Sequence, residues 1–202
     1  SSDVCSSDLD ACVRREESRT KKLLEAALDT VRKEHPDWNL EILNLMDLDL
    51  MYWKTETLKE RDELLAKKEY DAPVFKYGNQ FREADGVIVA APFWDLSIPA
   101  VLKVYIENIS AEGITFGCNE SGLYGLCKAK WLLFLTTRGG IWADSDMEQG
   151  STYMEALCKF FGIDEYACVY ADGIDVQELD GEEILREAIE ETKGICTRLS
   201  CE

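Results

Sequence analysis

The chain has 202 residues, of which 40 are Asp or Glu and 22 are Lys or Arg, so its formal charge is −18. This length suits one α/β domain with a sizeable core. The acidic balance argues against partners such as nucleic acids or anionic membrane surfaces, which need a basic face. The longest apolar runs, residues 86–93 and 131–135, are much shorter than the roughly 20 residues of a membrane-spanning helix. The only histidine, His35, leaves no set of His ligands for a metal.

The first nine residues, Ser1 to Leu9, read SSDVCSSDL and lack both a hydrophobic period and the apolar core of a signal peptide. They match, residue for residue, the translation of a common short-read sequencing adapter. We therefore expect residues 1–9 to be an adapter artefact and residues 10–202 to form a single domain, since no repeat or linker interrupts them. The alternative is a natural polar N-terminal tail.

Eight cysteines are spread along the chain, and no two of them have C-x-x-C spacing, which argues against zinc and thioredoxin-like motifs. Cys158 and Cys168 lie in apolar stretches, where a free thiol behaves as a small hydrophobic group. An even number of cysteines also permits disulfides. We expect reduced thiols and a cytoplasmic protein.

Helical and extended patterns alternate along the rest of the chain. Residues 18–34 carry one apolar stripe at helical spacing and begin with Ser18, a favourable N-cap residue. Two continuous apolar runs, GVIVAA and WLLFLTT, are typical of parallel strands that are buried on both faces. The alternation predicts a doubly wound parallel sheet with helices on both faces. The predicted helices span 18–34, 57–70, 73–84, 99–109, 151–161 and 182–199, the strands 40–43, 86–91, 131–137 and 166–170, and a small hairpin 114–124.

Ligands bind at the carboxyl ends of the strands in such sheets, so the loops after strands are where chemistry is expected. Residues 12–20 offer hydroxyl and guanidinium groups before a helix start, which suits either a phosphate site or an ordinary capped helix. Residues 92–99 place two aromatic rings after a buried strand, as a flat binding surface or as a hydrophobic plug. Residues 136–140 contain paired glycines, which permit close approach to a flat ligand or simply form a turn.

The three loops together indicate a protein family far more specifically than any one of them alone. SRT at 18–20, APFWDLSIPAVLKVYIENI at 91–109, GITFGCNESGLYGL at 113–126 and TTRGGI at 136–141 resemble the FMN-dependent NAD(P)H oxidoreductases of the azoreductase and quinone-reductase family. The resemblance covers nearly all of residues 10–202. It implies a flavodoxin-like fold, FMN as cofactor, NADH or NADPH as electron donor, a quinone or azo acceptor in ping-pong exchange, and a homodimer. It also implies that the flavin, not a catalytic side chain, carries the chemistry.

The same resemblance implies which residues of this chain contact FMN. The phosphate would lie against Ser18, Arg19 and Thr20, next to Cys12. The isoalloxazine ring would lie along Pro92, Phe93, Trp94 and Asp95. Its other polar edge would lie against Thr137, Arg138, Gly139 and Gly140.

Three of this chain's residues depart from the family pattern. Cys12 stands where some relatives have a serine, which weakens one phosphate contact. Asp95 stands where others have asparagine, so it can accept a hydrogen bond from flavin N3–H but cannot donate one to O4. Trp142 stands where some relatives have a histidine, and His35 is expected to be a solvated residue at the far end of the first helix.

A different class of function also fits, namely a flavodoxin-like electron carrier without a substrate of its own. Its acidic surface would dock on basic partners. The Trp94 loop and residues 113–126 favour the enzyme, because they suggest an enclosed substrate pocket.

The flavodoxin-like order places the first strand in the middle of the sheet, yet the residues before the phosphate loop are mostly polar. Between Asp3 and Asp10, only Val4, Cys5 and Leu9 are apolar. We expect a truncated first strand. Either residues 4–11 enter the strand position and bury Ser and Asp side chains, or the position stays partly open. Each outcome costs on the order of several kcal/mol, so we expect a marginally folded chain that binds FMN poorly.

Overall fold

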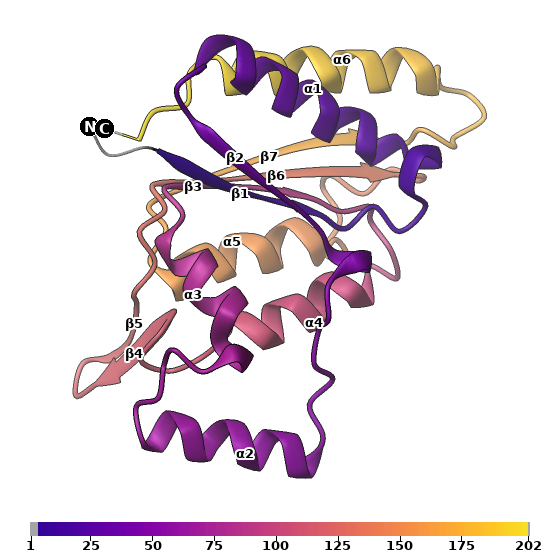
Figure 1. Ribbon diagram of the computed structural model, residues 1–202. Coiled ribbons are helices and arrows are strands. Elements are labelled where there is room, and N and C mark those ends of the chain that lie inside the picture. Colours follow the sequence, from indigo (N-terminus) through magenta and orange to yellow (C-terminus); the bar gives the residue numbers. More distant parts are fainter. Residues whose placement is uncertain (1–3, 202) are drawn as a thin grey trace.

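The computed structural model describes residues 4–201 and contains a five-stranded parallel sheet between helices (Figure 1). The strand order is β2-β1-β3-β6-β7, which is the flavodoxin-like order and confirms the predicted fold class. All neighbouring strands of this sheet are parallel, so their carboxyl ends meet at one edge. The strands are β1 (Cys5–Asp10), β2 (Asn39–Asn44), β3 (Gly86–Ala90), β6 (Trp131–Arg138) and β7 (Glu165–Asp172).

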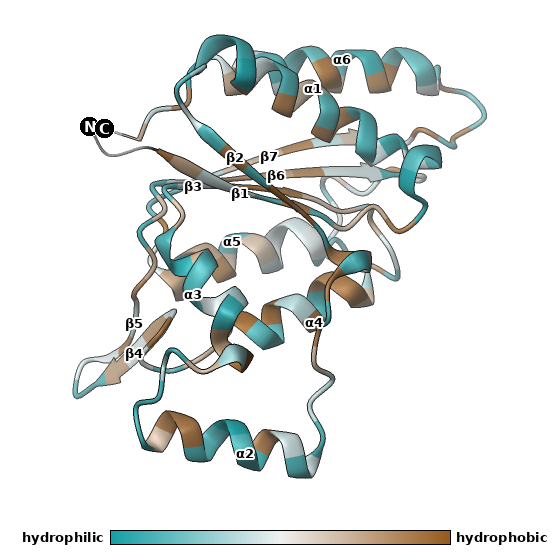
Figure 2. Ribbon diagram, in the orientation of Figure 1, coloured by the Kyte–Doolittle hydropathy of each residue, from teal (hydrophilic) through white to brown (hydrophobic). Residues whose placement is uncertain are grey.

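Helices cover both faces of the sheet. On one face, α1 (Arg19–Glu34) and α6 (Gly181–Cys196) pack on alternate strand residues such as Ile88 and Leu133. On the other, α3 (Lys76–Glu83), α4 (Ala100–Ile109) and α5 (Gly150–Phe161) pack on the residues in between. Teal and brown alternate along α1 and α6 in Figure 2, as expected for helices with one apolar face. Because two cores share each central strand, these strands need continuous apolar runs.

Two elements lie away from the sheet. Helix α2 (Thr55–Ala66) has no buried residue and sits beyond the layer of α3 and α4 (Figure 1). It ends earlier than predicted, because Lys68 adopts the left-handed conformation with φ 58°. The predicted hairpin is formed by β4 (Phe116–Asn119) and β5 (Gly122–Gly125). The single helix predicted from residue 73 is divided into a 3₁₀ turn, Pro73–Phe75, and α3.

The first strand position is occupied by residues 5–10, the first of the two expected outcomes. The sheet therefore includes Cys5–Leu9, from the segment expected to precede the domain, while residues 1–3 lie outside the described residues. Ser6, Ser7 and Asp8 are at most 1% exposed. Asp8 Oδ2 accepts a hydrogen bond from Ser6 Oγ, but Asp8 Oδ1 has no hydrogen-bond partner. Burial disfavours the charged carboxylate and raises the pKa of Asp8 to about 7.

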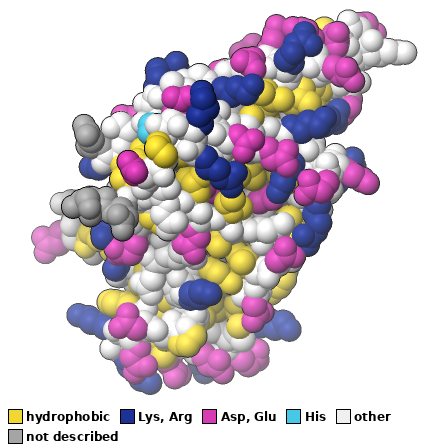
Figure 3. Space-filling model, turned by 45° about the horizontal axis from the view of Figure 1, so that its top comes forward, with side chains coloured by type: hydrophobic (Ala, Val, Ile, Leu, Met, Phe, Trp, Pro, Cys, Tyr) yellow, Lys and Arg dark blue, Asp and Glu magenta, His cyan; other side chains and the backbone are white. Residues whose placement is uncertain are grey.

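Three expectations from the composition concern the surface charges, membrane-spanning helices and the cysteines. On the face that Figure 3 shows, Lys and Arg lie scattered among Asp and Glu. Within residues 4–201, no helix combines the length and apolar character needed to cross a bilayer. The eight cysteines all lie among the described residues and are free thiols there.

His35 differs from its expected environment. Its ring stacks on Trp38 with 4.1 Å between centroids, and its Nε2 lies 3.2 Å from the carbonyl oxygen of Cys196. The residue is half-buried rather than solvated, because the end of α1 packs beside the end of α6.

Candidate active site

The loops after β1, β3, β6 and β7 meet at the carboxyl edge of the sheet around a cavity of about 180 Å³. Contacts between the loops fix its walls. The backbone N–H of Phe93 donates to the Thr137 carbonyl at 3.1 Å, and the hydroxyls of Thr20 and Thr137 lie 2.7 Å apart. The lining consists of Arg14, Glu17, Ser18, Arg19, Pro92, Phe93, Trp94, Thr137, Gly139 and Asp175.

The loop after β1 is anchored at its base. The buried carboxylate of Asp10 accepts a hydrogen bond from the Cys12 backbone N–H at 2.9 Å and pairs with Lys21 Nζ at 2.5 Å. Cys12 is fully buried and does not reach the cavity; burial raises the pKa of its thiol. Ser18 occupies the N-cap position of α1, but its hydroxyl caps no backbone N–H of the helix. This hydroxyl and the positive end of the helix dipole therefore suit an anionic group.

Arg19 crosses the mouth of the cavity to Asp175. The guanidinium nitrogens lie 2.7 and 2.9 Å from the two carboxylate oxygens. Hydrogen bonds from Arg19 lower the pKa of Asp175. A Cβ added to Gly139 would lie 2.7 Å from Asp175 Oδ2, so a larger residue here would displace the Asp175 side chain from its present position. Arg19, the cation at the mouth of the cavity, is thus already paired with the carboxylate of Asp175.

The loop after β3 makes a tight turn beside the cavity. Trp94 and Ser97 exchange backbone hydrogen bonds at 3.1 and 2.8 Å, and Asp95 and Leu96 between them have φ of 47° and 66°. Two successive left-handed residues define a type I′ turn, which glycine or asparagine ordinarily occupies. Such backbone strain costs on the order of 1 kcal/mol per residue and concentrates at functional sites. The turn presents Trp94 at the cavity and Asp95 at its exposed tip.

The structure divides the predicted site residues into two groups. Arg14, Glu17 and Asp175 also line the cavity but were not predicted as FMN contacts. The same rule about strand ends, applied to the loop after β7, could have found Asp175. Ser18, Arg19, Pro92, Phe93, Trp94, Thr137 and Gly139 line the cavity. Cys12, Thr20, Asp95, Arg138 and Gly140 belong to the same loops but do not line it.

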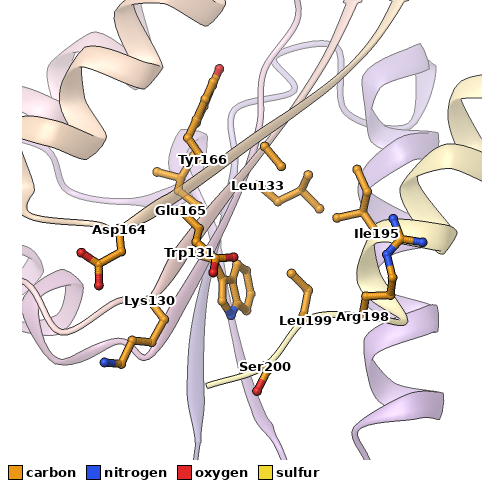
Figure 4. A pocket seen from close by; sticks show the side chains of 12 residues that line it. Lys130, Trp131, Leu133, Asp164, Glu165, Tyr166, Ile195, Arg198, Leu199 and Ser200 are labelled. Carbon is orange, nitrogen blue, oxygen red and sulfur yellow. The ribbon is translucent and has the colours of Figure 1, made fainter. Parts of the chain in front are cut away.

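A larger cavity of about 540 Å³ lies at the opposite edge of the sheet (Figure 4). It lies between the first residues of β6 and β7 and the end of α6, with Trp131, Glu165 and Arg198 around it. The amino ends of the strands are not where ligands bind in this class of sheet. The smaller cavity at the carboxyl edge is therefore the candidate active site.

Comparison with known proteins agrees with this geometry. The family model described as flavodoxin-like fold matches residues 9–195. An FMN-dependent NADH:quinone oxidoreductase of Clostridium beijerinckii is 35% identical, over 87% of this chain and 89% of the relative. One of Coprothermobacter proteolyticus is 34% identical, over 89% and 91%. The crystal structure of azoreductase from Bacillus anthracis superposes with a TM-score of 0.88 at 28% identity, covering 97% of this chain and all of that one.

A parallel sheet in this order, with its cavity at the carboxyl edge, defines a flavodoxin-like protein. Within that class, the chain belongs to the family of the FMN-dependent NADH:quinone oxidoreductases and azoreductases. The predicted family is thereby confirmed.

Proposed function

We propose that this chain is an FMN-dependent oxidoreductase that passes two electrons from NADH or NADPH to quinones, azo compounds or both, by ping-pong exchange. One observation carries the proposal. A single cavity joins a helix start suited to an anion, two aromatic side chains and a glycine edge, in a chain whose relatives are named for this activity. The names of the relatives favour NADH as the donor.

The lining fits FMN in both of its chemical parts. Ser18, Arg19 and the start of α1 would hold the phosphate, because they offer a hydroxyl, a guanidinium and the helix dipole. Phe93 and Trp94 would contact the isoalloxazine ring. FMN, when bound, supplies the redox chemistry.

The other residues of the three loops would tune the site. The backbone around Thr137 and Gly139 would approach the polar edge of the ring, since Gly139 carries no side chain. Asp95, at the exposed tip of the turn after Trp94, would act on the ring through its negative charge, which would oppose negative charge on the flavin.

We further propose a cytoplasmic homodimer without nucleic-acid or membrane partners. Trp94, Leu96, Ile141 and Met147 surround the site on its loops and are 36% to 66% exposed. A second copy that covered them would bury apolar surface and exclude water from the cavity. The sedimentation coefficient of the purified protein tests the dimer, and the free thiols agree with a reducing compartment.

The functional domain is proposed to be residues 10–202, with residues 1–9 derived from an adapter. In support, the family match begins at residue 9. Residues 5–9 would then supply backbone hydrogen bonds to the sheet and the Leu9 side chain to the core, without a site residue among them.

The test is a spectrum of the purified protein after FMN addition and gel filtration, followed by NADH or NADPH under anaerobic conditions. Although the polar strand β1 led us to expect weak FMN binding, no residue of β1 lines the cavity. We therefore expect retained FMN, rapid bleaching by the donor, and recovery of colour when a quinone or azo dye is added. Bound FMN that bleaches only with a separate reductase would instead support the electron carrier, which the charge of −18 favours. Absence of FMN binding would overturn both.

A further inference from the structure

Arg138, the last residue of β6, is among the largest fully buried side chains of the described residues, with 1% exposure. Its guanidinium carbon lies 5.7 Å from the ring centroid of Phe93 and 4.5 Å from that of Tyr170. Phe93 lines the cavity, whereas Arg138 does not. The guanidinium therefore supports a wall of the site without reaching into it.

Two carboxylates face the same guanidinium. Arg138 Nη2 lies 3.4 Å from Glu148 Oε1, and Nη1 lies 3.6 Å from Asp172 Oδ1. The side chains of Glu148 and Asp172 are 6% and 12% exposed, so all three charges are largely removed from water. We call these three residues the Arg138 cluster. Its single cation balances two buried anions.

The carboxylates of the cluster tie residues 139–149, the segment between β6 and α5, to the end of β7 through Asp172 and to the start of α5 through Glu148. Asp172 Oδ2 accepts hydrogen bonds from the backbone N–H groups of Trp142 and Ala143 at 2.8 and 3.0 Å. Glu148 Oε1 accepts from those of Gly150 and Ser151, both at 2.9 Å. The segment also touches the cavity wall, since the Trp142 ring lies 5.6 Å from that of Phe93.

We propose that Arg138 is a positioning residue for the flavin cavity: its guanidinium fixes residues 139–149 through Glu148 and Asp172, and it supports the Phe93 ring directly. The inference rests on the proposed function, because it assigns the side chain a role in presetting that site. It differs from the sequence-based expectation for Arg138, which placed this residue against the flavin itself.

The physical reason is the cost of leaving charges unpaired. Without the guanidinium, Glu148 and Asp172 would face each other in a dry site, and hydration would draw them outward. The backbone N–H groups that they hold would follow, and Phe93 would lose its support on one side. A lysine retains the charge but lacks the planar fork that faces two carboxylates and two aromatic rings.

The experiment compares Arg138→Met and Arg138→Lys with two controls. Arg186→Met removes an arginine that is 64% exposed and pairs with Glu183 on α6. Val31→Ala removes core volume at the other end of α1, so it lowers global stability without touching the cluster. Two quantities are measured: amide hydrogen exchange of the protein without FMN, and FMN affinity by quenching of flavin fluorescence.

We expect Arg138→Met to speed exchange in residues 139–149 relative to the rest of the sheet and to weaken FMN binding by about tenfold or more. Arg138→Lys should fall between Arg138→Met and the unmodified chain, and Arg186→Met should match the unmodified chain. Equal exchange in Arg138→Met and Val31→Ala, or FMN affinity unchanged in Arg138→Met, would overturn the proposal.

Two further outcomes distinguish failure of the Arg138 proposal from failure to fold and from failure of the proposed function. If Arg138→Met does not fold, Arg138→Lys must show the local increase in exchange, and its absence there counts against the proposal. If the unmodified chain binds no FMN, the proposed function fails, while exchange of the unloaded variants still decides whether Arg138 fixes the segment.

Discussion

Strands β1 and β3 are paired neighbours with opposite compositions. Ser6–Asp10 lies in parallel register with Gly86–Ala90, and both segments are buried. Strand β3 reads GVIVA and supplies both cores, whereas β1 reads CSSDLD and places a carboxyl at the corresponding point, opposite Ile88. The pair teaches that backbone hydrogen bonding, to which any sequence can contribute, positions a strand, while its side chains decide how stable the result is.

The difference between the strands stops short of the cavity. The Ala11 N–H donates to the Ala90 carbonyl at 2.9 Å, so the last residues of both strands are tied together. Strand β1 then leads into the loop with Ser18, and β3 into the loop with Phe93. The polar residues of β1 therefore lower the stability of the chain more than they disturb the geometry of the cavity.

Asp8→Val should produce the largest effect, by making β1 resemble β3. Valine would lie between Ile42 and Ile88 on the neighbouring strands. Since the pKa of Asp8 is raised from 3.8 to about 7, ionising this carboxyl costs the folded state roughly 4 kcal/mol above pH 7. We expect a gain of about 4 kcal/mol in the free energy of unfolding at pH 8, measured by urea denaturation.

Glu41→Val is the control for Asp8→Val, because Glu41 is exposed on the edge strand β2. It should change stability by less than about 1 kcal/mol. An equal gain in both variants would mean that β propensity, not the buried carboxyl, sets the stability of β1.

The same carboxyl should make the unmodified chain less stable as pH rises. The folded state keeps the Asp8 proton to about pH 7, whereas the unfolded chain loses it near pH 4. The folded state binds more protons between these values, so the free energy of unfolding should fall across that range by up to about 4 kcal/mol from this group. Asp8→Asn should flatten the profile; an unchanged slope in that variant would assign the pH dependence to other groups.

Most of the architecture was predictable, because the local hydrophobic pattern of each segment agreed with its burial in the folded chain. GVIVA and the WLLFL run form the central strands β3 and β6, and the loops after them line the cavity at the carboxyl edge. What the sequence could not supply were pairings across distant segments. The contact of Arg19 with Asp175 spans 156 positions, and no local pattern marks it. The position of Arg138 was equally hidden, because a charged residue at a strand end normally points to solvent.

Ser18→Ala and Thr20→Ala test whether the loop after the polar strand still binds its ligand. Ser18→Ala should weaken FMN binding by about 1–2 kcal/mol, the scale of one hydrogen bond to a charged group, and Thr20→Ala should weaken it by less, because Thr20 does not line the cavity. Ser18 would act directly at the phosphate and Thr20 through its 2.7 Å contact with Thr137. Isothermal titration measures the affinities, with Thr30→Ala as control, since its hydroxyl bonds to Ala26 farther along α1. Unchanged affinity in both variants would remove the phosphate site from this loop.

Asp175→Asn should produce the smallest effect, at the loop that follows the edge strand β7. The Arg19–Asp175 pair is about half exposed, so it is worth less than about 1 kcal/mol. Releasing Arg19 from its carboxylate should free it for the FMN phosphate and raise affinity by about two- to fivefold at low salt, with the gain fading as salt rises. Riboflavin, which has no phosphate, should bind both forms equally and serves as the control. Weaker FMN binding in Asp175→Asn would show instead that the ion pair holds Arg19 in its binding position, and an equal gain for riboflavin would place the effect at the ring rather than at the phosphate.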